Sequence, residues 1–245
     1  MNSYVILGAT GGVGSALCER LAGSGAQLVL GGRDGQRLEQ LAHTTGGHPF
    51  TLDATLPVQV EACVQAAVER YGHLDGIVNC VGSLLLKPAH LTSDDEWAAT
   101  LAANLTSAFA AVRAGARAMM RTGGSIVLVS SAAARIGLAN HEAIAAAKSG
   151  VIGLTLAAAA SYGARGIRVN CVAPGLVRTQ LTARLTANES SLKASEAMHA
   201  LGRIGEPADV AAALAWLLDS AQGWVTGQVL GIDGGLGSVR ARGTA

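Results

Sequence analysis

Short apolar runs alternate with longer stretches of helical periodicity along the whole chain. The apolar runs predict seven strands, at Tyr4–Gly8, Gln27–Leu30, Pro49–Leu52, Gly76–Asn79, Ser125–Ser130, Arg168–Ala173 and Gln228–Ile232. The intervening segments predict helices, including Gly12–Ala22, Gly35–His43, Leu56–Tyr71, Asp94–Met120 and Glu142–Tyr162. Strands that alternate with helices form right-handed βαβ crossovers, so the pattern predicts a parallel sheet that helices cover on both faces.

Some of the strand segments are apolar throughout rather than alternating between apolar and polar residues. The run from Ile126 to Val129 is the clearest case. A strand of this kind suits a sheet that is buried on both faces. The chain has no linker, internal repeat or low-complexity tract. We therefore predict an α/β fold, a Rossmann-type doubly wound parallel sheet of about seven strands, in a single domain over residues 1–245.

The predicted helix around Gly150–Ala160 is apolar on nearly every side. Such a helix must be covered on more than one side, and the sheet covers only one of them. The second cover is either a neighbouring helix of the same chain or another subunit. We expect another subunit, and therefore a homo-oligomer, either a dimer or a tetramer.

Composition argues against several classes of protein. Half of the residues are apolar, 14% are charged and the formal net charge is +1, with no block of Lys or Arg. This balance favours a domain with a sizeable core and argues against partners such as nucleic acid or a membrane surface. The N-terminus has no basic leader, and the four cysteines form no CxxC pair. We expect a soluble cytoplasmic protein with free thiols and no metal site.

A glycine-rich turn links the first predicted strand to the first predicted helix, with the spacing Gly-x3-Gly-x-Gly. Glycine permits a tight turn and a close approach to a pyrophosphate, and the N-terminus of the following helix favours anions. A glycine turn without a ligand is the alternative, but the strand–turn–helix context is the one that a dinucleotide requires. The residues expected to contact the dinucleotide here are Gly8, Thr10, Gly11, Gly12, Val13 and Gly14.

Further motifs, spread over nearly the whole chain, resemble those of the short-chain dehydrogenase/reductase family. They are Asp53, Asn79-Cys80-Val81-Gly82, Asn104, Ser131, Lys148, Pro174-Gly175 with Val177 and Thr179, Leu201–Pro207 and Thr226–Gly235. The resemblance implies that the residues contacting the dinucleotide also include Asp53, Asn79, Gly82, Lys148, Pro174, Gly175, Val177 and Thr179. The second and third positions of the motif that begins at Asn79 depart from the family's Asn-Asn-Ala-Gly.

The end of the second predicted strand bears on the choice between NAD and NADP. An acidic side chain there binds the ribose 2′-hydroxyl of NAD, whereas a basic one pairs with the 2′-phosphate of NADP. Gly32 stands where family members that prefer NAD usually carry Asp, and Arg33 follows it directly. The alternatives are that Arg33 stacks on adenine or stays a solvated charge beside Asp34. We expect NADP(H) to be favoured over NAD(H).

The resemblance also implies a catalytic set with one gap. In the family a Ser polarises the substrate carbonyl, a Tyr four residues before a Lys transfers the proton, the Lys holds the nicotinamide ribose and an Asn helps to hold a water. Ser131, Lys148 and Asn104 match three of these positions. Ile144 stands at the Tyr position, thirteen residues after Ser131 and four before Lys148, and its side chain has no proton to give.

Two groups are candidates for the missing proton transfer. His141 lies three residues before Ile144 and seven before Lys148, so the three share one face of the predicted helix. An imidazole suits proton transfer near neutral pH, which makes His141 a candidate catalytic residue. Alternatively, His141 only opens the helix and a water held by Asn104 and Lys148 carries the proton.

These residues are compatible with three functions. We favour an NAD(P)(H)-dependent oxidoreductase that acts on a small-molecule carbonyl or secondary alcohol substrate through an atypical proton relay. The alternatives are a dinucleotide-binding protein with little or no redox activity, acting as a sensor or partner subunit, and a non-redox enzyme that reuses Ser131. The segment from Thr179 to Met198 is expected to form a mobile, polar lid, and Leu84–Leu86 line either the cleft or the core. None of these features identifies the substrate.

Overall fold

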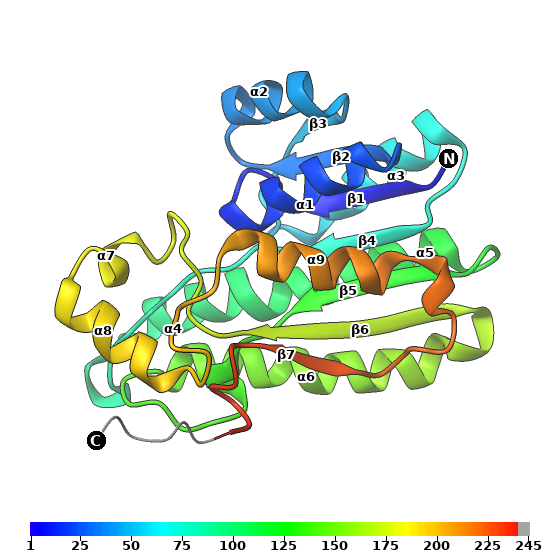
Figure 1. The fold of residues 1–245 in the computed structure, drawn as a ribbon. Coiled ribbons are helices and arrows are strands. Elements are labelled where there is room, and N and C mark those ends of the chain that lie inside the picture. The colour runs from blue at the N-terminus through cyan, green and yellow to red at the C-terminus, as the bar shows by residue number, and fades with distance from the viewer. Residues whose placement is uncertain (240–245) are drawn as a thin grey trace.

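The computed structural model describes residues 1–239 and arranges seven parallel strands in one sheet (Figure 1). The strands are β1 (Ser3–Leu7), β2 (Gln27–Gly32), β3 (His48–Thr51), β4 (Gly76–Asn79), β5 (Gly124–Val129), β6 (Ile167–Pro174) and β7 (Val229–Ile232). Their order across the sheet is β3-β2-β1-β4-β5-β6-β7. Each strand lies within two residues of its predicted bounds, and the predicted α/β fold is confirmed.

The direction of winding reverses between β1 and β4, which are neighbours near the middle of the sheet. These two strands pair from Tyr4 opposite Gly76 to Leu7 opposite Asn79. In open parallel sheets, ligands bind beyond the carboxyl ends of the strands at such a reversal. The two short helices α7 (Ala183–Thr186) and α8 (Glu189–Met198) lie beyond these ends (Figure 1).

Helices cover both faces of the sheet, as predicted. Besides α7 and α8 they are α1 (Gly12–Gly23), α2 (Gly35–Thr45), α3 (Pro57–Tyr71), α4 (Asp94–Leu101), α5 (Ser107–Met119), α6 (Glu142–Tyr162) and α9 (Pro207–Leu218). Helices α1, α2 and α9 pack on one face, and α3, α5 and α6 pack on the other (Figure 1). Each face therefore has its own apolar core.

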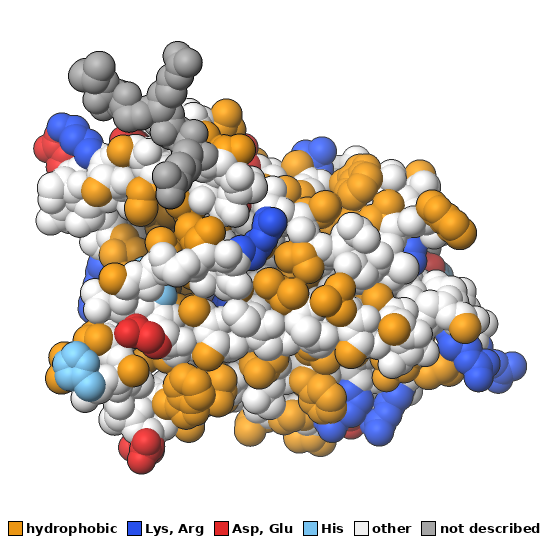
Figure 2. Space-filling view, turned by 90° about the horizontal axis from the view of Figure 1, so that it is seen from below, with side chains coloured by type: hydrophobic (Ala, Val, Ile, Leu, Met, Phe, Trp, Pro, Cys, Tyr) orange, Lys and Arg blue, Asp and Glu red, His pale blue; other side chains and the backbone are white. Residues whose placement is uncertain are grey.

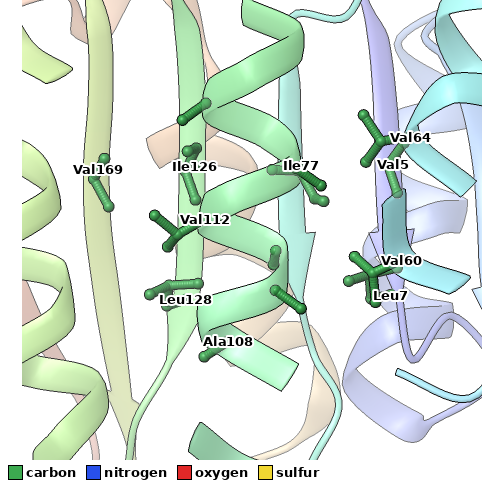
Figure 3. Close-up of a cluster of buried hydrophobic side chains, with 14 of the residues drawn as sticks. Val5, Leu7, Val60, Val64, Ile77, Ala108, Val112, Ile126, Leu128 and Val169 are labelled. Atoms are coloured by element: carbon green, nitrogen blue, oxygen red, sulfur yellow. The ribbon is translucent and has the colours of Figure 1, made fainter. Parts of the chain in front are cut away.

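The core beneath α5 holds the two strands that lead into the candidate site. Val112 of α5 packs against Ile126 and Leu128 of β5 (Figure 3). Helix α5 and the sheet approach closely at Gly115, which has no side chain. A Cβ at this position would lie only 2.6 Å from Cγ2 of Ile77. Complete burial of an aliphatic side chain contributes about 1.5–3 kcal/mol, so this layer fixes β4 and β5 firmly.

The predicted helix Asp94–Met120 is interrupted in the middle. A π-helical turn, Ala102–Thr106, separates α4 from α5 and contains Asn104. Single π turns inside α-helices are frequent at functional sites. The apolar periodicity does not reveal this turn, because the helical segments on both sides continue to bury apolar residues.

Three α-helices of the described residues have no counterpart in the predicted segments. Two of them, α7 and α8, form the lid segment, and the third is α9. The sequence of α9 is almost uniformly apolar and so lacks a helical period. Its start nevertheless carries a recognisable signal, because Glu206 and Asp209 form a capping box around Pro207 in the first turn.

One helix of the described chain, Glu142–Arg165, is long and apolar enough to cross a membrane by length and composition alone. In this fold it packs on β6 and against α4 and α5, and 44% of its most apolar window is buried. Neighbouring elements of the same chain therefore supply part of its cover. Leu156 on its outer side stays 51% exposed.

Candidate active site

A cleft of about 480 Å³ lies beyond the carboxyl ends of β4, β5 and β6. The loops that follow these strands form its walls, together with the start of α6 and the lid. The predicted site residues that line it are Val13, Gly82, Asn104, Ser131, His141, Lys148, Pro174, Gly175, Val177 and Thr179. Ile144 lines the same cleft. The fold thus gathers all four predicted catalytic residues around Ile144.

The glycine turn leaves the N-terminus of α1 open. Gly8 has a φ of 76°, and a Cβ on Gly14 would overlap the carbonyl oxygen of Gly8. Gly11 caps α1 without any side-chain hydrogen bond, so the first N–H groups of this helix remain available to an anion. Gly12 faces the loop after β6, where a Cβ would lie 2.9 Å from Cγ2 of Thr179. This bare turn fits the pyrophosphate of a dinucleotide.

Two predicted dinucleotide residues, Arg33 and Asp53, lie farther along the same edge of the sheet, after β2 and β3. Asp53 accepts hydrogen bonds from the backbone and the hydroxyl of Thr55, at 2.9 and 2.8 Å. These bonds, with the nearby charge of Arg33, hold the pKa of Asp53 below its usual value. Arg33 itself is exposed, and Gly32 puts no carboxylate at the end of β2.

A second arginine, Arg37 of α2, reaches the same region and was not predicted. Its guanidinium donates to the carbonyl oxygen of Thr10 in the glycine turn and to Oε1 of Gln180 in the lid, both at 2.9 Å. Arg37 therefore joins α2, the glycine turn and the start of the lid. The only sequence signal for this role is its position four residues after Arg33.

Ser131 and Lys148 come from the end of β5 and from α6. The Ser131 Oγ accepts a hydrogen bond from the backbone N–H of Ala133 at 3.1 Å, so its own proton can point into the cleft. The Lys148 Nζ donates to the carbonyl oxygen of Val129 at 2.8 Å. Burial lowers the pKa of Lys148 to about 8. The hydroxyl of Ser130 is occupied, because it donates to the carbonyl oxygen of Lys148 at 2.8 Å.

Asn104 braces the loop after β4 against the π-helical turn. Its amide nitrogen donates to Oγ of Ser83 and to the carbonyl oxygen of Thr100, both at 2.9 Å, and its Oδ1 accepts from the backbone of Ser83 at 3.2 Å. A Cβ on Gly82 would lie 2.9 Å from Oδ1 of Asn104 and 3.5 Å from Nζ of Lys148. Glycine at position 82 therefore keeps the approach to both side chains open.

Asn79 has a different place from the other predicted residues. Its amide nitrogen donates to Oγ of Ser107 in α5 at 3.0 Å, and its Oδ1 accepts from the backbone of Val81 at 3.1 Å. The side chain is buried and does not line the cleft. In this structure Asn79 ties β4 to α5 and shapes the loop that follows.

The position where a tyrosine is expected holds the buried, apolar side chain of Ile144, which is 3% exposed. His141 precedes it at the start of α6 and lines the same cleft. Its Nδ1 lies 2.7 Å from the carbonyl oxygen of Ala139. Because a carbonyl oxygen only accepts, Nδ1 carries a proton, and Nε2 of the neutral ring keeps a lone pair.

A second histidine of the cleft, His199, was not predicted. Its Nε2 accepts from the backbone N–H of Leu176 at 3.2 Å, and its Nδ1 donates to the carbonyl oxygen of Ser195 at 2.6 Å. The ring is 2% exposed and both nitrogens are engaged. His199 thus fixes the end of α8 to the loop after β6. No motif in the sequence predicts this role of His199.

The lid presents an apolar side to the cleft, so the expectation of a polar lid is wrong for this side. The cleft is lined from the lid by Leu181, Leu185 and Met198, and from the loop after β4 by Leu84 and Leu86. The polar residues that dominate the composition of the lid lie mostly elsewhere, as the contact of Gln180 with Arg37 illustrates. Helical turns sort the two kinds of side chain onto different sides.

Comparison with known proteins identifies the family of this chain. A family model described as "Enoyl-(Acyl carrier protein) reductase" matches residues 8–237. A short-chain type dehydrogenase/reductase of solved structure, from Mycobacterium ulcerans, is 32% identical and superposes with a TM-score of 0.90, over 98% of this chain and 91% of that one. The chain belongs to the short-chain dehydrogenase/reductase family.

Other similar short-chain dehydrogenases/reductases have varied substrates in their names. The 3-oxoacyl-(acyl-carrier-protein) reductase FabG of Vibrio cholerae is 33% identical, over 95% of this chain and 96% of the relative. A D-threitol dehydrogenase of Mycolicibacterium smegmatis is also 33% identical, over 94% and 91%. An actinorhodin polyketide ketoreductase solved with NADPH is 29% identical, with a TM-score of 0.91 over 97% and 98%. By their names these three relatives are oxidoreductases that do not share one substrate.

Proposed function

We propose that this short-chain dehydrogenase/reductase transfers a hydride between NADP(H) and a small-molecule carbonyl or secondary alcohol, through a proton relay without the usual tyrosine. The main support is the convergence of Ser131, Lys148 and His141 in one cleft beside the glycine turn. A protein that only bound a dinucleotide would have no need for a free serine hydroxyl at this point.

Each of these side chains has one task in the proposed reaction. The bound dinucleotide supplies the hydride in reduction and takes it up in oxidation. The Ser131 hydroxyl donates a hydrogen bond to the substrate oxygen and polarises the carbonyl group. The Lys148 ammonium, open to the cleft past Gly82, holds the nicotinamide ribose.

His141 moves the proton. In alcohol oxidation the lone pair on Nε2 accepts the hydroxyl proton while the hydride leaves the adjacent carbon. In carbonyl reduction the protonated ring returns that proton to the oxygen, and the neutral ring with its proton on Nδ1 is restored. A general acid or base typically contributes about 10²- to 10⁴-fold, so His141 would carry a substantial share of the rate.

The residues expected to contact the adenosine end of the cofactor support NADP(H) over NAD(H). Arg33 is exposed directly after β2, Gly32 offers no carboxylate to a ribose hydroxyl, and Arg37 adds a second positive charge beside Thr10.

Calorimetric titration tests this preference, with NADPH expected to bind at least tenfold more tightly than NADH. Arg33→Ala is expected to weaken NADPH binding and to leave NADH binding nearly unchanged. Tighter binding of NADH to the unchanged protein would contradict the preference.

A second candidate function is dinucleotide binding with little or no redox activity, as a sensor or partner subunit. The buried isoleucine at position 144 favours it, because an alkyl side chain cannot exchange a proton. Purified protein mixed with NADPH and a panel of ketones and aldehydes separates the two candidates through the absorbance of the cofactor. Turnover supports the oxidoreductase, whereas tight NADPH binding without turnover supports the binding protein.

Variants at two positions test the relay. Ile144→Tyr is expected to raise the rate of turnover, and Ile144→Phe serves as its control because it adds a ring without a hydroxyl.

His141→Ala is expected to lower the rate at least tenfold while NADPH binding stays the same, and His90→Ala, outside the cleft, controls for loss of a histidine. Full activity in His141→Ala would rule out His141 as the proton carrier.

A further inference from the structure

We propose that the substrate of this cleft is a neutral, largely apolar molecule with a single carbonyl or hydroxyl group. This inference rests on the proposed function in taking Lys148 as the contact for the nicotinamide ribose, and Ser131 and His141 as the contacts for one substrate oxygen. It concerns what the cleft binds, and it can be tested without any turnover.

The charge of the cleft excludes an anionic substrate. Among the described residues that line it, Lys148 is the only Lys, Arg, Asp or Glu. The Lys148 ammonium already donates to the carbonyl oxygen of Val129 and is assigned to the dinucleotide. The protonated His141 ring is assigned to the reacting oxygen, so a separate carboxylate or phosphate on the substrate would lose its hydration without gaining a partner of opposite charge, which is strongly unfavourable.

The polar side chains of the cleft leave few free hydrogen-bonding groups for a molecule with many hydroxyl groups. Asn104 donates to Ser83 and Thr100, both nitrogens of His199 are engaged, and the hydroxyl of Ser195 donates to the carbonyl oxygen of Ser191 at 2.9 Å. Besides Lys148 and the hydroxyl of Ser83, whose oxygen already accepts from Asn104, the side-chain polar groups that remain open are the Ser131 hydroxyl and Nε2 of His141. Together these two serve one oxygen atom.

The hydrocarbon surface of the cleft is available to a ligand. Leu86, Leu181 and Met198 line the cleft and remain 37%, 56% and 47% exposed. Ile144 extends this apolar wall to the place where the substrate oxygen is expected. Covering such side chains with an apolar ligand removes hydrocarbon from water, which favours binding. The dinucleotide shares the space of about 480 Å³, so the substrate is compact.

Ligand binding to the protein loaded with NADP⁺ tests the inference without relying on turnover. The probes are ketones of different polarity: 1-decalone, dihydroxyacetone and 2-oxoglutarate. Titration calorimetry is expected to show 1-decalone binding at least tenfold more tightly than either polar ketone. Equal or tighter binding of a polar ketone, or no binding of 1-decalone, overturns the inference.

Two leucines of equal exposure provide a matched pair of variants. Leu181→Asn, in the lid, is expected to weaken 1-decalone binding about tenfold, because it replaces apolar contact surface by an amide. Leu91→Asn is expected to leave binding unchanged, because Leu91 is 57% exposed but does not line the cleft. Unchanged binding in Leu181→Asn, with the protein folded by circular dichroism, counts against the apolar wall.

The same titrations separate this inference from the proposed redox function. If 1-decalone binds and neither it nor any ketone or aldehyde of the panel is reduced with NADPH, the apolar site stands and the redox function fails. If a hydroxylated ketone is reduced and 1-decalone does not bind, the redox function stands and the apolar site fails.

Discussion

At the scale of single residues, position 144 contrasts with its surroundings. Ser131, Lys148 and Asn104 keep the spacing expected around it, and all of them line one cleft. The spacing could be predicted because it depends only on positions in the chain. The sequence left two candidates for the proton carrier, because the choice depends on which side chains the loops before α6 turn inward. His141 illustrates this, since the carbonyl oxygen of Ala139 fixes its proton on Nδ1.

Lys148 illustrates a conflict between function and stability at one residue. Burial lowers its pKa from 10.5 to about 8. The folded chain must therefore hold a desolvated ammonium below pH 8, which costs as much as about 3 kcal/mol at 1.36 kcal/mol per pKa unit. Lys148→Met is expected to stabilise the protein without cofactor at pH 7 by up to this amount and to weaken dinucleotide binding.

The pH dependence of this effect has a definite sign. Between pH 8 and pH 10.5 the unfolded chain keeps the Lys148 proton that the folded chain has lost, so the unchanged protein gains stability as pH rises. The advantage of Lys148→Met should therefore shrink over this range. Urea unfolding at a series of pH values measures it, with the exposed Lys193→Met as control. An advantage that stays constant with pH would contradict the assignment.

At the scale of elements, the strands were predicted closely and the lid was not. A strand such as β5, buried on both faces, leaves an apolar run that local composition reveals. The short helices α7 and α8 expose most of their residues. Their mostly polar composition therefore predicts a polar lid and gives no sign of the few apolar side chains that line the cleft. The π-helical turn at Asn104 is equally invisible, because it changes the helix by one residue without changing its apolar character.

The start of α1 offers a matched test of the glycine turn. Gly14 lies where a Cβ would overlap the carbonyl oxygen of Gly8, whereas a Cβ on Gly23, at the end of the same helix, would meet no atom of another described element within 4 Å. Gly14→Ala is expected to abolish measurable dinucleotide binding and to lower the free energy of unfolding by more than about 1 kcal/mol, because the turn must open. Gly23→Ala is expected to be neutral or to stabilise by about 0.5–1 kcal/mol. Thermal unfolding and NADPH titration measure both, and equal behaviour of the two variants would contradict this role of the turn.

At the scale of the whole molecule, the two cores leave an outer surface that is not uniformly polar. The face seen from below in Figure 2 carries many hydrophobic side chains. Helices α4, α5 and α6 pack together and carry Trp97, Phe109 and Leu156, which are 42%, 49% and 51% exposed. Large apolar side chains exposed on helices that pack together favour a surface that binds another protein. A second copy of the chain is the partner that the apolar character of α6 led us to expect.

Solution mass tests this association. Light scattering coupled to gel filtration is expected to give two or four times the chain mass of 24.6 kDa. Phe109→Lys combined with Leu156→Lys places two like charges on the proposed contact, and a buried unpaired charge is strongly unfavourable, so this variant should shift toward the monomer. Val58→Lys, on α3 with Val58 70% exposed, is the control and should keep the mass of the unchanged protein. A monomeric mass of the unchanged protein would mean that α6 is covered by its own chain alone. An unaltered mass of the double variant would mean that the subunits contact each other through another face.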